Sequence, residues 1–371
     1  METLVWSGKS WLLNEKQVEM FKRIAIAVLS LFPTIGGLTA SLNAQGWSEP
    51  VAVTSDTCMD FNGAMALDCY GRPWIFFTKV TGGQLDVYGS YCDGLTWGTP
   101  MQLTSDSAFD ANPDAVVDGI GRLWICWESR KDGDPNIYTC YYDGSGWSSP
   151  LQVTSDTLWD IIPAITIDGE GTIWVTWIHW EVGLDIFASC YNDTVWSPPV
   201  KVSNSGTVQS CIPAMTTDSL GRPWVTWTEG DSTEIYCSYY QNGSWVTPIR
   251  VTTDPRWDQD SDIVTDASGN IWVFWDRYVM LPDVNNIWAS YYDGAVWHEP
   301  FPITYWDATE TEATAVVSTT TGVIWLVWRG NWWGPMSLCY SYYDGTGWSW
   351  PARVDSTYEY GDLFPAVIAQ P

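Results

Sequence analysis

Short apolar runs alternate with polar turn sequences along most of this chain, in a pattern that recurs roughly every 50 residues. One clear copy has runs at Trp147–Thr154, Pro163–Asp168, Thr172–Trp177 and Asp185–Tyr191. Each run is rich in β-branched or aromatic residues and is bounded by Gly, Asn, Asp or Ser, which is typical of strands. None of them has the 3.6-residue apolar period of a helix. The pattern therefore predicts four short strands per repeat.

The third run of the repeat carries two tryptophans, Trp174 and Trp177, three residues apart. On a strand these side chains point to opposite faces, so the sheet needs cover on both sides. Four-stranded sheets stacked radially give this cover, because each blade of a β-propeller packs against two neighbours. A self-similar period near 50 residues is also typical of propellers. We therefore predict an all-β propeller of four-stranded antiparallel blades.

Counting the repeats predicts six full blades and a partial seventh. The third-run tryptophan recurs six times, as Trp74, Trp124, Trp174, Trp224, Trp272 and Trp325. We name the strands of a blade A to D from the axis outward. A lone D-type segment, Trp47–Thr54, opens the domain, and a lone A-type segment, Pro365–Ala369, follows the sixth blade. These segments predict either a truncated seven-blade propeller or six blades that close with spare strands.

Residues 1–44 do not belong to the repeat and resemble a secretory signal segment. Lys22 and Arg23 precede the apolar run Ile24–Phe32, and small residues continue to Ala44. The run is too short for a membrane span, and Met20 is an alternative start. We expect residues 45–371 to form a single propeller domain that is secreted, periplasmic or at the cell surface, with no membrane insertion of the mature chain.

Composition narrows the possible partners. The formal net charge is −28, which argues against nucleic acids and anionic membranes, because both need basic patches. The 28 tryptophans fall mostly in register with the repeat and are expected in the inter-blade core. The nine cysteines do not recur as a set, so they predict buried small residues rather than a disulfide framework. A bridge between Cys126 and Cys140 is the alternative.

The sequences DGEGTIWVTW, SYYDG and GWSxP resemble those of secreted bacterial propellers of the sialidase-like (BNR-repeat) group and of propeller lectins. The resemblance covers about residues 46–371. It is one of propeller style, because the chain has D-x-x-G-x-x-W where the sialidase box has S-x-D-x-G-x-x-W. What it implies is an extracellular ligand, with a glycan first, and a sialidase-like glycoside hydrolase as the alternative.

The D–A and B–C connections lie on the same face of a propeller, and here the repeats diverge, so this face is the expected binding face. The D–A connections share a recurring carboxylate, often after an aromatic residue. The carboxylates are Asp60, Asp110, Asp160, Asp258, Glu310 and Asp362, and the aromatics are Phe109, Trp159 and Trp257. Such a ring suits sugars, but the repetition favours a structural role in which each carboxylate caps its own turn.

The B–C connections vary more and supply most of the candidate ligand-binding residues. Three arginines in separate blades suit a carboxylate group of the kind that sialidases bind, yet the family's Arg-Ile-Pro motif is absent. With the aromatic and acidic residues of the D–A connections, the candidates are Glu128, Arg130, Trp159, Asp160, His179, Trp180, Glu229, Trp257, Asp258, Asp276, Arg277, Arg329, Trp332 and Trp333.

Other chemistries have little support in the sequence. With only His179 and His298, neither a histidine metal cluster nor a Ser-His-Asp site is expected. Asp258, Asp260 and Asp262 alternate like the start of a calcium loop, but the Gly and distal Glu of such a loop are missing. We therefore expect no cofactor, with calcium as the alternative. The sequence predicts an exported, non-catalytic propeller that binds a glycan, or alternatively a surface protein.

Overall fold

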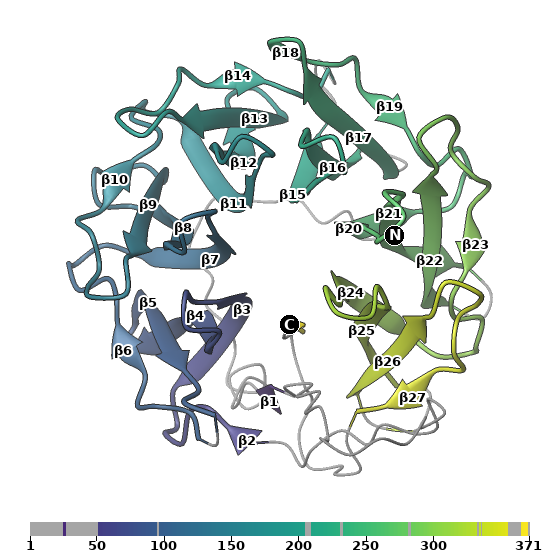
Figure 1. The fold of residues 1–371 in the computed structure, drawn as a ribbon, viewed down its shortest axis with the longest axis horizontal. Coiled ribbons are helices and arrows are strands. Elements are labelled where there is room, and N and C mark those ends of the chain that lie inside the picture. The colour runs from purple at the N-terminus through teal and green to yellow at the C-terminus, as the bar shows by residue number, and fades with distance from the viewer. Residues whose placement is uncertain are drawn as a thin grey trace.

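Six four-stranded antiparallel sheets stand around a central axis, so the chain is an all-β propeller, as the repeat predicts (Figure 1). The computed structural model describes residues 25–26, 51–94, 96–204, 209–230, 233–280, 283–331, 334, 336–354 and 365–369. Within these residues every regular element is a strand.

Each blade runs A, B, C, D from the axis outward, and its strands follow one another in the sequence. Blade 1 contains β3 (Met59–Leu67), β4 (Pro73–Thr81), β5 (Gln84–Tyr91) and β6 (Met101–Gln102). Blade 2 contains β7 (Asp110–Val117), β8 (Leu123–Ser129), β9 (Asn136–Tyr142) and β10 (Leu151–Gln152). Blade 3 contains β11 (Trp159–Ile167), β12 (Ile173–Trp180), β13 (Leu184–Tyr191) and β14 (Val200–Lys201).

The second half of the ring repeats this order. Blade 4 contains β15 (Ser210–Thr217), β16 (Pro223–Glu229), β17 (Glu234–Gln241) and β19 (Ile249–Arg250), with the short β18 (Ser244–Trp245) also paired to β17. Blade 5 contains β20 (Asp258–Thr265), β21 (Ile271–Val279), β22 (Val284–Tyr292) and β23 (Phe301–Pro302). Blade 6 contains β24 (Glu310–Val317), β25 (Ile324–Gly330), β26 (Ser337–Tyr343) and β27 (Ala352–Arg353).

The outermost strands are shorter than the sequence predicts. The run Trp147–Thr154 was expected to be one strand, but it forms a single bridge from Trp147 to Tyr142 and then the two-residue β10. The cause is Pro150, which lies between the two pairings and has no N–H to continue the ladder. The same interruption recurs in the other blades.

The A–B turns explain the D-x-x-G-x-x-W motif. In blade 2, Oδ1 of Asp118 accepts the backbone N–H groups of Ile120 and Arg122 at 3.1 and 2.8 Å. Oδ2 of Asp118 accepts the indole N–H of Trp124 at 2.9 Å. Gly121 has a φ of +86°, which a residue with a side chain adopts only with strain. Equivalent indole bonds reach Asp68, Asp168, Asp218 and Asp266.

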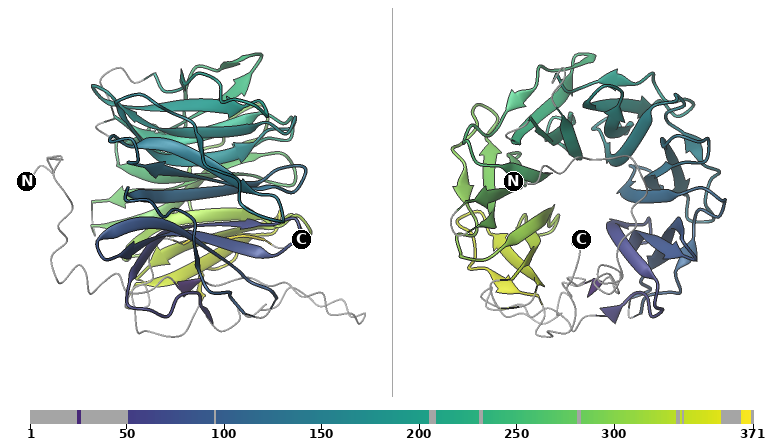
Figure 2. Two further views of the ribbon diagram at one scale, coloured as in Figure 1. Left: turned by 90° about the vertical axis from the view of Figure 1, so that its left-hand side faces the viewer. Right: turned by 180° about the vertical axis from the view of Figure 1, so that it is seen from behind.

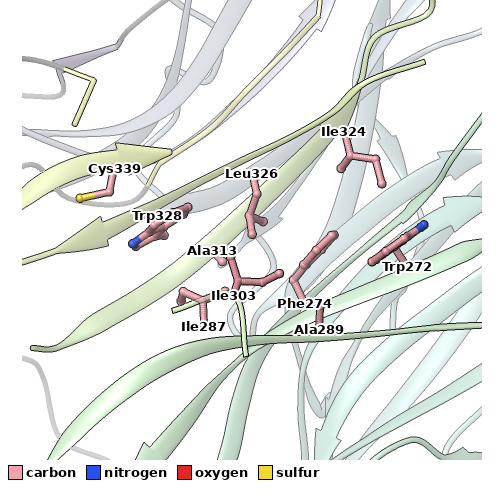
Figure 3. Packing of buried hydrophobic residues seen from close by; sticks show 10 residues of the cluster. All are labelled: Trp272, Phe274, Ile287, Ala289, Ile303, Ala313, Ile324, Leu326, Trp328 and Cys339. Atoms are coloured by element: carbon pink, nitrogen blue, oxygen red, sulfur yellow. The ribbon is translucent and has the colours of Figure 1, made fainter. Parts of the chain in front are cut away.

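The core lies between blades, as the paired tryptophans predict. Trp177 is fully buried in a cluster with Trp124 and Cys126 of blade 2. On the opposite face of the same strand, Trp174 contacts Tyr240 and Trp245 of blade 4, with ring centroids 4.5 and 5.6 Å apart. Figure 3 shows the equivalent packing between blades 5 and 6, where Trp272 and Phe274 lie opposite Leu326 and Trp328.

All nine cysteines are free. The alternative of a bridge between Cys126 and Cys140 is wrong, because the two residues lie on opposite faces of the blade 2 sheet. Cys126 packs into the cluster shared with blade 3, and Cys140 packs into the cluster shared with blade 1. Both behave as buried small hydrophobic residues, as the sequence predicts.

The ends of the repeat meet between blades 6 and 1 (Figures 1 and 2). There β2 (Val51–Ala52) pairs with β1 (Ala25–Ile26), which falls inside the predicted signal segment. Val367 packs against Val327 and Leu338 of blade 6, and a Cβ built on Gly63 of blade 1 would lie 4.0 Å from the Cβ of Ala366. The described strands form six complete blades, and the partial seventh blade stays a prediction. Trp47, like residues 1–44 apart from Ala25 and Ile26, lies outside the described residues.

No helix of the described part of the chain is long and apolar enough to span a membrane.

The two-sided core gives a test of stability. Trp174 is 5% exposed and supports the contact between blades 3 and 4. We expect Trp174→Ala to lower the free energy of unfolding by about 3–5 kcal/mol, as for other buried aromatics. Trp180→Ala, at the end of the same strand and only partly buried, should cost far less. Thermal or denaturant melts check this, and equal losses would contradict the assignment of core and rim.

Candidate functional site

The recurring carboxylates of the D–A connections are buried parts of the scaffold. Asp60, Asp110, Asp160, Asp258 and Glu310 begin the innermost strands and are at most 6% exposed. In blade 3, Oδ1 of Asp160 accepts the indole N–H of Trp177 at 2.7 Å. The predicted structural role is thus favoured, but the partner differs from the one expected, because this carboxylate binds an indole of its own blade. Asp362 lies outside the described residues.

Two blades preserve this indole bond by compensating changes. In blade 4 the first residue of the A strand is Ser210, and Glu229 on the neighbouring B strand accepts the indole N–H of Trp227 at 2.8 Å instead. In blade 6 the longer Glu310 accepts the indole N–H of Trp328, and the facing residue is Gly330. A Cβ at Gly330 would meet the carboxylate of Glu310, so the glycine leaves room for the longer acid in the position seen here. Glu229 therefore has a structural role in blade 4, and a contact of Glu229 with a ligand stays a prediction.

A positively charged or protonatable side chain lies beside this carboxylate in blades 1, 3 and 5. Arg277 donates to both oxygens of Asp258 at 2.6 and 2.7 Å, and lies 3.8 Å from Asp254. His179 Nδ1 lies 2.7 Å from Asp160, and Lys79 bonds to Asp56 at 2.5 Å. Each of these side chains connects the B strand to the D–A connection of its own blade. Arg277 therefore pairs with Asp258 and His179 with Oδ1 of Asp160, while Oδ2 of Asp160 is buried without a hydrogen-bond partner among the described residues.

His179 is also part of a possible metal-binding group. One ligand atom each of Asp156, Asp160 and His179 lies within 4.8 Å of the others, in a search confined to the described residues. The equivalent place in blades 1 and 5 is filled by Lys79 and Arg277, so the blade 3 group is better explained as the same ionic contact. Asp258 and Asp262, which alternate with Asp260 like the start of a calcium loop, bond to Arg277 and to the N–H of Ala315 respectively.

We call the face of the propeller that carries the D–A and B–C connections its upper face. The residues that differ from blade to blade lie around the axis, at a β-bulge near the upper end of each A strand. The register of A against B shifts at this point in all six blades, and one residue per bulge has a φ between +51° and +56°. Left-handed backbone is strained for most residues and most of all for β-branched ones. We call this set the bulge ring: Asn62, Asn112, Ile162, Ile212, Asp260 and Glu312.

The chemical character of the bulge ring changes around the axis. Blades 1 and 2 contribute amides, with the Nδ2 of Asn62 donating to the Oδ1 of Asn112. Blades 3 and 4 contribute the isoleucines, of which Ile212 is 38% exposed. Blades 5 and 6 contribute Asp260 and Glu312. The ring is therefore amide, apolar and acidic in turn, although the scaffold that carries it repeats.

Side chains of the preceding blade hold several bulges in place. The N–H of Asn112 bonds to Oγ1 of Thr78 at 3.1 Å. The N–H of Ile162 bonds to Glu128 at 2.7 Å, and that of Glu312 bonds to Asp276 at 3.1 and 3.2 Å. Thr78, Glu128 and Asp276 occupy the same place on their B strands. Glu128 and Asp276 therefore support the bulge ring.

The acidic sector carries shifted pKa values. Burial, reinforced by the nearby Glu312, raises the pKa of Asp260 to about 6. Burial also raises the pKa of Asp276 well above its usual range, with the charge of Asp260 adding to the effect. Arg329 donates to both oxygens of Glu312 at 2.7 and 2.8 Å. A carboxyl group that keeps its proton near pH 6 can donate a hydrogen bond or a proton.

Phe109, Trp159 and Trp180, with Arg130 beside them, lie on the upper ends of blades 2 and 3, and we call this group the aromatic shelf. The guanidinium of Arg130 lies 6.0 Å from the ring centre of Phe109 and 5.2 Å from that of Trp159. Trp159 meets Trp180 edge to face at 5.1 Å, and its indole N–H bonds to Asp134. On blade 5, Trp257 is 55% exposed and lies 5.7 Å from Tyr278. Aromatic faces beside directed polar groups are what sugar sites use.

The structure thus separates the predicted site residues into groups. Glu128, Arg130, Trp159 and Trp180 come together on blades 2 and 3. Asp276 and Arg329 both bond to Glu312, the first through its backbone N–H and the second through its carboxylate. Trp257 lies on blade 5, as Asp276 does. Trp332 and Trp333 lie outside the described residues.

The candidate residues expected from the sequence do not include Asn62, Asn112, Asp260, Glu312 and Tyr278, which the structure places on the same face. A signal for four of them exists, because they form one variable column, two residues after the recurring carboxylate. That column alternates between amide, isoleucine and acid inside an otherwise regular strand.

Comparison with solved structures supports the fold. A protein of unknown function from Dyadobacter fermentans aligns over 87% of this chain and 98% of its own, at 10% identity and a TM-score of 0.58. The α-L-arabinanase of Penicillium chrysogenum, solved with arabinobiose, aligns over 77% and 93%, at 13% identity and a TM-score of 0.57. The NanB sialidase of Streptococcus pneumoniae aligns over 72% and 65%, at 9% identity and a TM-score of 0.51.

The likeness is one of fold. At these identities it confirms the resemblance to sialidase-like propellers in architecture and assigns no residue a role. No family model matches the sequence, and no curated protein matches it.

The contact of blade 3 predicts a dependence of stability on pH. The hydrogen bond to Asp160 raises the pKa of His179, with Asp156 and Glu181 adding to the effect. The stabilisation is therefore complete below the pKa of about 6.5 for an unfolded histidine, and it is lost as pH rises through the higher folded value. We expect His179→Lys, which copies Lys79, to keep this stabilisation at pH 8. Melting temperatures of both proteins between pH 5.5 and 8.5 check this, and parallel curves would contradict it.

Proposed function

We propose that this protein is an exported propeller that binds a neutral glycan on its upper face, over the bulge ring and the aromatic shelf. The observation that carries the proposal is the change from amide to apolar to acidic side chains around one repeating axis. A purely structural column would repeat, as the buried carboxylates and indoles do. A ligand with distinct sides, such as a sugar ring with C–H faces and hydroxyl edges, accounts for this asymmetry.

The charges of this face favour a neutral sugar over an anionic one. The three candidate arginines belong to blades 2, 5 and 6, and Arg277 and Arg329 are bound to Asp258 and Glu312. Arg130 is held between two aromatic rings. A carboxylate already paired with an arginine partly neutralises the charge of that arginine and occupies some of its N–H donors, which weakens its attraction for an acidic sugar. Binding of the carboxylate of an acidic sugar by three arginines, as in sialidases, therefore has little support.

Export is part of the proposal and is supported by the basic-then-apolar pattern of residues 22–44. Sequencing the N-terminus of exported protein, expected near Gln45, tests it. An uncleaved Met1 on cytoplasmic protein would contradict it.

Binding on the upper face is tested with two variants and a control from the opposite face. We expect Trp180→Ala and Arg329→Met to weaken binding of the best neutral glycan on an array about tenfold or more, since buried aromatic and arginine contacts dominate such interfaces. Asp143→Asn, in a C–D turn whose carboxylate only caps Ser145 and Gly146, should leave binding unchanged. Melting curves establish that all three proteins fold. Loss of binding in Asp143→Asn alone would place the ligand on the other face.

The second candidate function is glycoside hydrolysis, which the raised pKa of Asp260 favours. A general acid must keep its proton at the working pH, and Asp260 has a pKa of about 6 beside a second carboxylate, Glu312. If the protein is a hydrolase, the release of reducing sugar should fall as pH rises through about 6. Asp260→Asn should then abolish release while binding remains. Release of no sugar from any glycan that the protein binds would reject this candidate.

A further inference from the structure

Three aromatic side chains meet at the junction of blades 5 and 6, away from the bulge ring. Tyr305 and Trp306 follow β23 in the D–A connection, and Trp350 precedes β27. The rings of Tyr305 and Trp306 are stacked with centroids 4.9 Å apart. The ring of Trp350 lies 4.9 Å from Trp306 and 6.3 Å from Tyr305, at interplanar angles of 76° and 80°. We call these three residues the rim cluster.

Each member of the rim cluster replaces a residue that is not aromatic in the other blades. Tyr305 stands where they have Ser55, Ser105, Ser155, Asn204 and Thr253. Trp306 stands where four of them have Asp56, Asp106, Asp156 and Asp254. Trp350 stands where they have Thr99, Ser149, Pro198, Thr247 and Glu299. Three separate departures from the repeat converge on one place.

One of these departures gives up a structural contact. Each of the four aspartates accepts the backbone N–H two residues ahead, at 2.8 to 3.0 Å, in a turn that fixes the D–A connection. An indole cannot accept that bond. In blade 6 the connection is held instead by the backbone N–H of Trp306, which donates to Oδ1 of Asn286 at 3.0 Å. The indole ring of Trp306 therefore does not take over the role of the aspartate in the turn.

Core packing does not account for the rim cluster either. Tyr305 and Trp350 are each 61% exposed. Two residues before Trp350, Trp348 already fills the inter-blade core of this segment against Trp272 and Phe274. Scattered exposed aromatics are ordinary, but three in mutual contact on a scaffold that is otherwise polar there need another explanation.

We propose that the rim cluster is a stacking site for a pyranose ring of a neutral polysaccharide. Aromatic rings set nearly at right angles offer flat faces to the C–H surface of a sugar and the edge groups of Tyr305 and the indoles to its hydroxyls. The exposed Asp307 beside them and the net charge of −28 disfavour an anionic chain. An apolar peptide or a second copy would need a broader apolar surface than the rim cluster offers within the described residues, with the exposed Asp307 next to it. This site does not depend on the bulge ring.

The test is electrophoresis of the full-length protein in native gels that contain a soluble polysaccharide. The neutral probes are arabinan, xylan and laminarin, and the anionic probe is polygalacturonate. We expect retardation in at least one neutral gel, and about fivefold or greater weakening in both Tyr305→Ala and Trp350→Ala. Trp350→Phe, which keeps a stacking face, should recover part of the affinity. The matched control is Tyr70→Ala, which changes a residue 66% exposed in an A–B turn on the opposite face.

The outcomes separate binding at the rim cluster from binding over the bulge ring and the aromatic shelf. Weakening in the rim variants with normal binding by Trp180→Ala supports the rim cluster alone. Unchanged retardation in both rim variants overturns it, even where Trp180→Ala loses binding. Retardation only by polygalacturonate, or none by any neutral probe, overturns it as well. A fall in mass by sedimentation in Trp350→Ala with retardation unchanged would show that the cluster joins two copies instead.

Discussion

The structure depends on carboxylates that accept indole N–H groups. Each B strand carries two large aromatic positions on opposite faces, and the indole N–H of a buried tryptophan needs an acceptor. In blade 3 the aspartate of the A–B turn, Asp168, accepts from Trp174. At the other end of the same strand Asp160 accepts from Trp177. Part of the net negative charge therefore belongs to the core of the fold, because the tryptophans that hold the blades together require acids at fixed places.

This requirement also explains which residues can vary. Blade 4 moves the carboxylate from Ser210 to Glu229, and blade 6 combines a longer Glu310 with Gly330, yet the acceptor for the indole is kept. Changes at such positions come in compensating pairs. Changes at the bulge ring and at the rim cluster lie outside these indole–carboxylate pairs, and Glu312 of the bulge ring pairs instead with Arg329 of its own blade. That contrast is the physical reason for placing function there.

Much of the fold could be predicted from the sequence. The spacing of Trp174 and Trp177 places large aromatic side chains on both faces of one strand, so both faces must be covered. The bulge ring could not be predicted, because a bulge is a relation between two strands and a single strand does not reveal its register. The role of Asp160 was predicted only in outline, since its indole partner lies 17 residues away. The rim cluster was missed for a different reason, because Trp350 and Tyr305 are more than 40 residues apart.

The distribution of positive charge limits what the upper face can bind. The chain has 16 lysines and arginines against 44 acids. In the part of the chain that the structure describes, cations of the B strands near this face are held by carboxylates of the scaffold, among them Lys79, Arg277 and Arg329. A sulfated or carboxylated sugar at Arg277 or Arg329 would compete with these acids, and a half-buried acid that lost its partner would carry a desolvation cost. Neutral sugars avoid this cost, because aromatic stacking and hydroxyl hydrogen bonds use the groups that the scaffold leaves available.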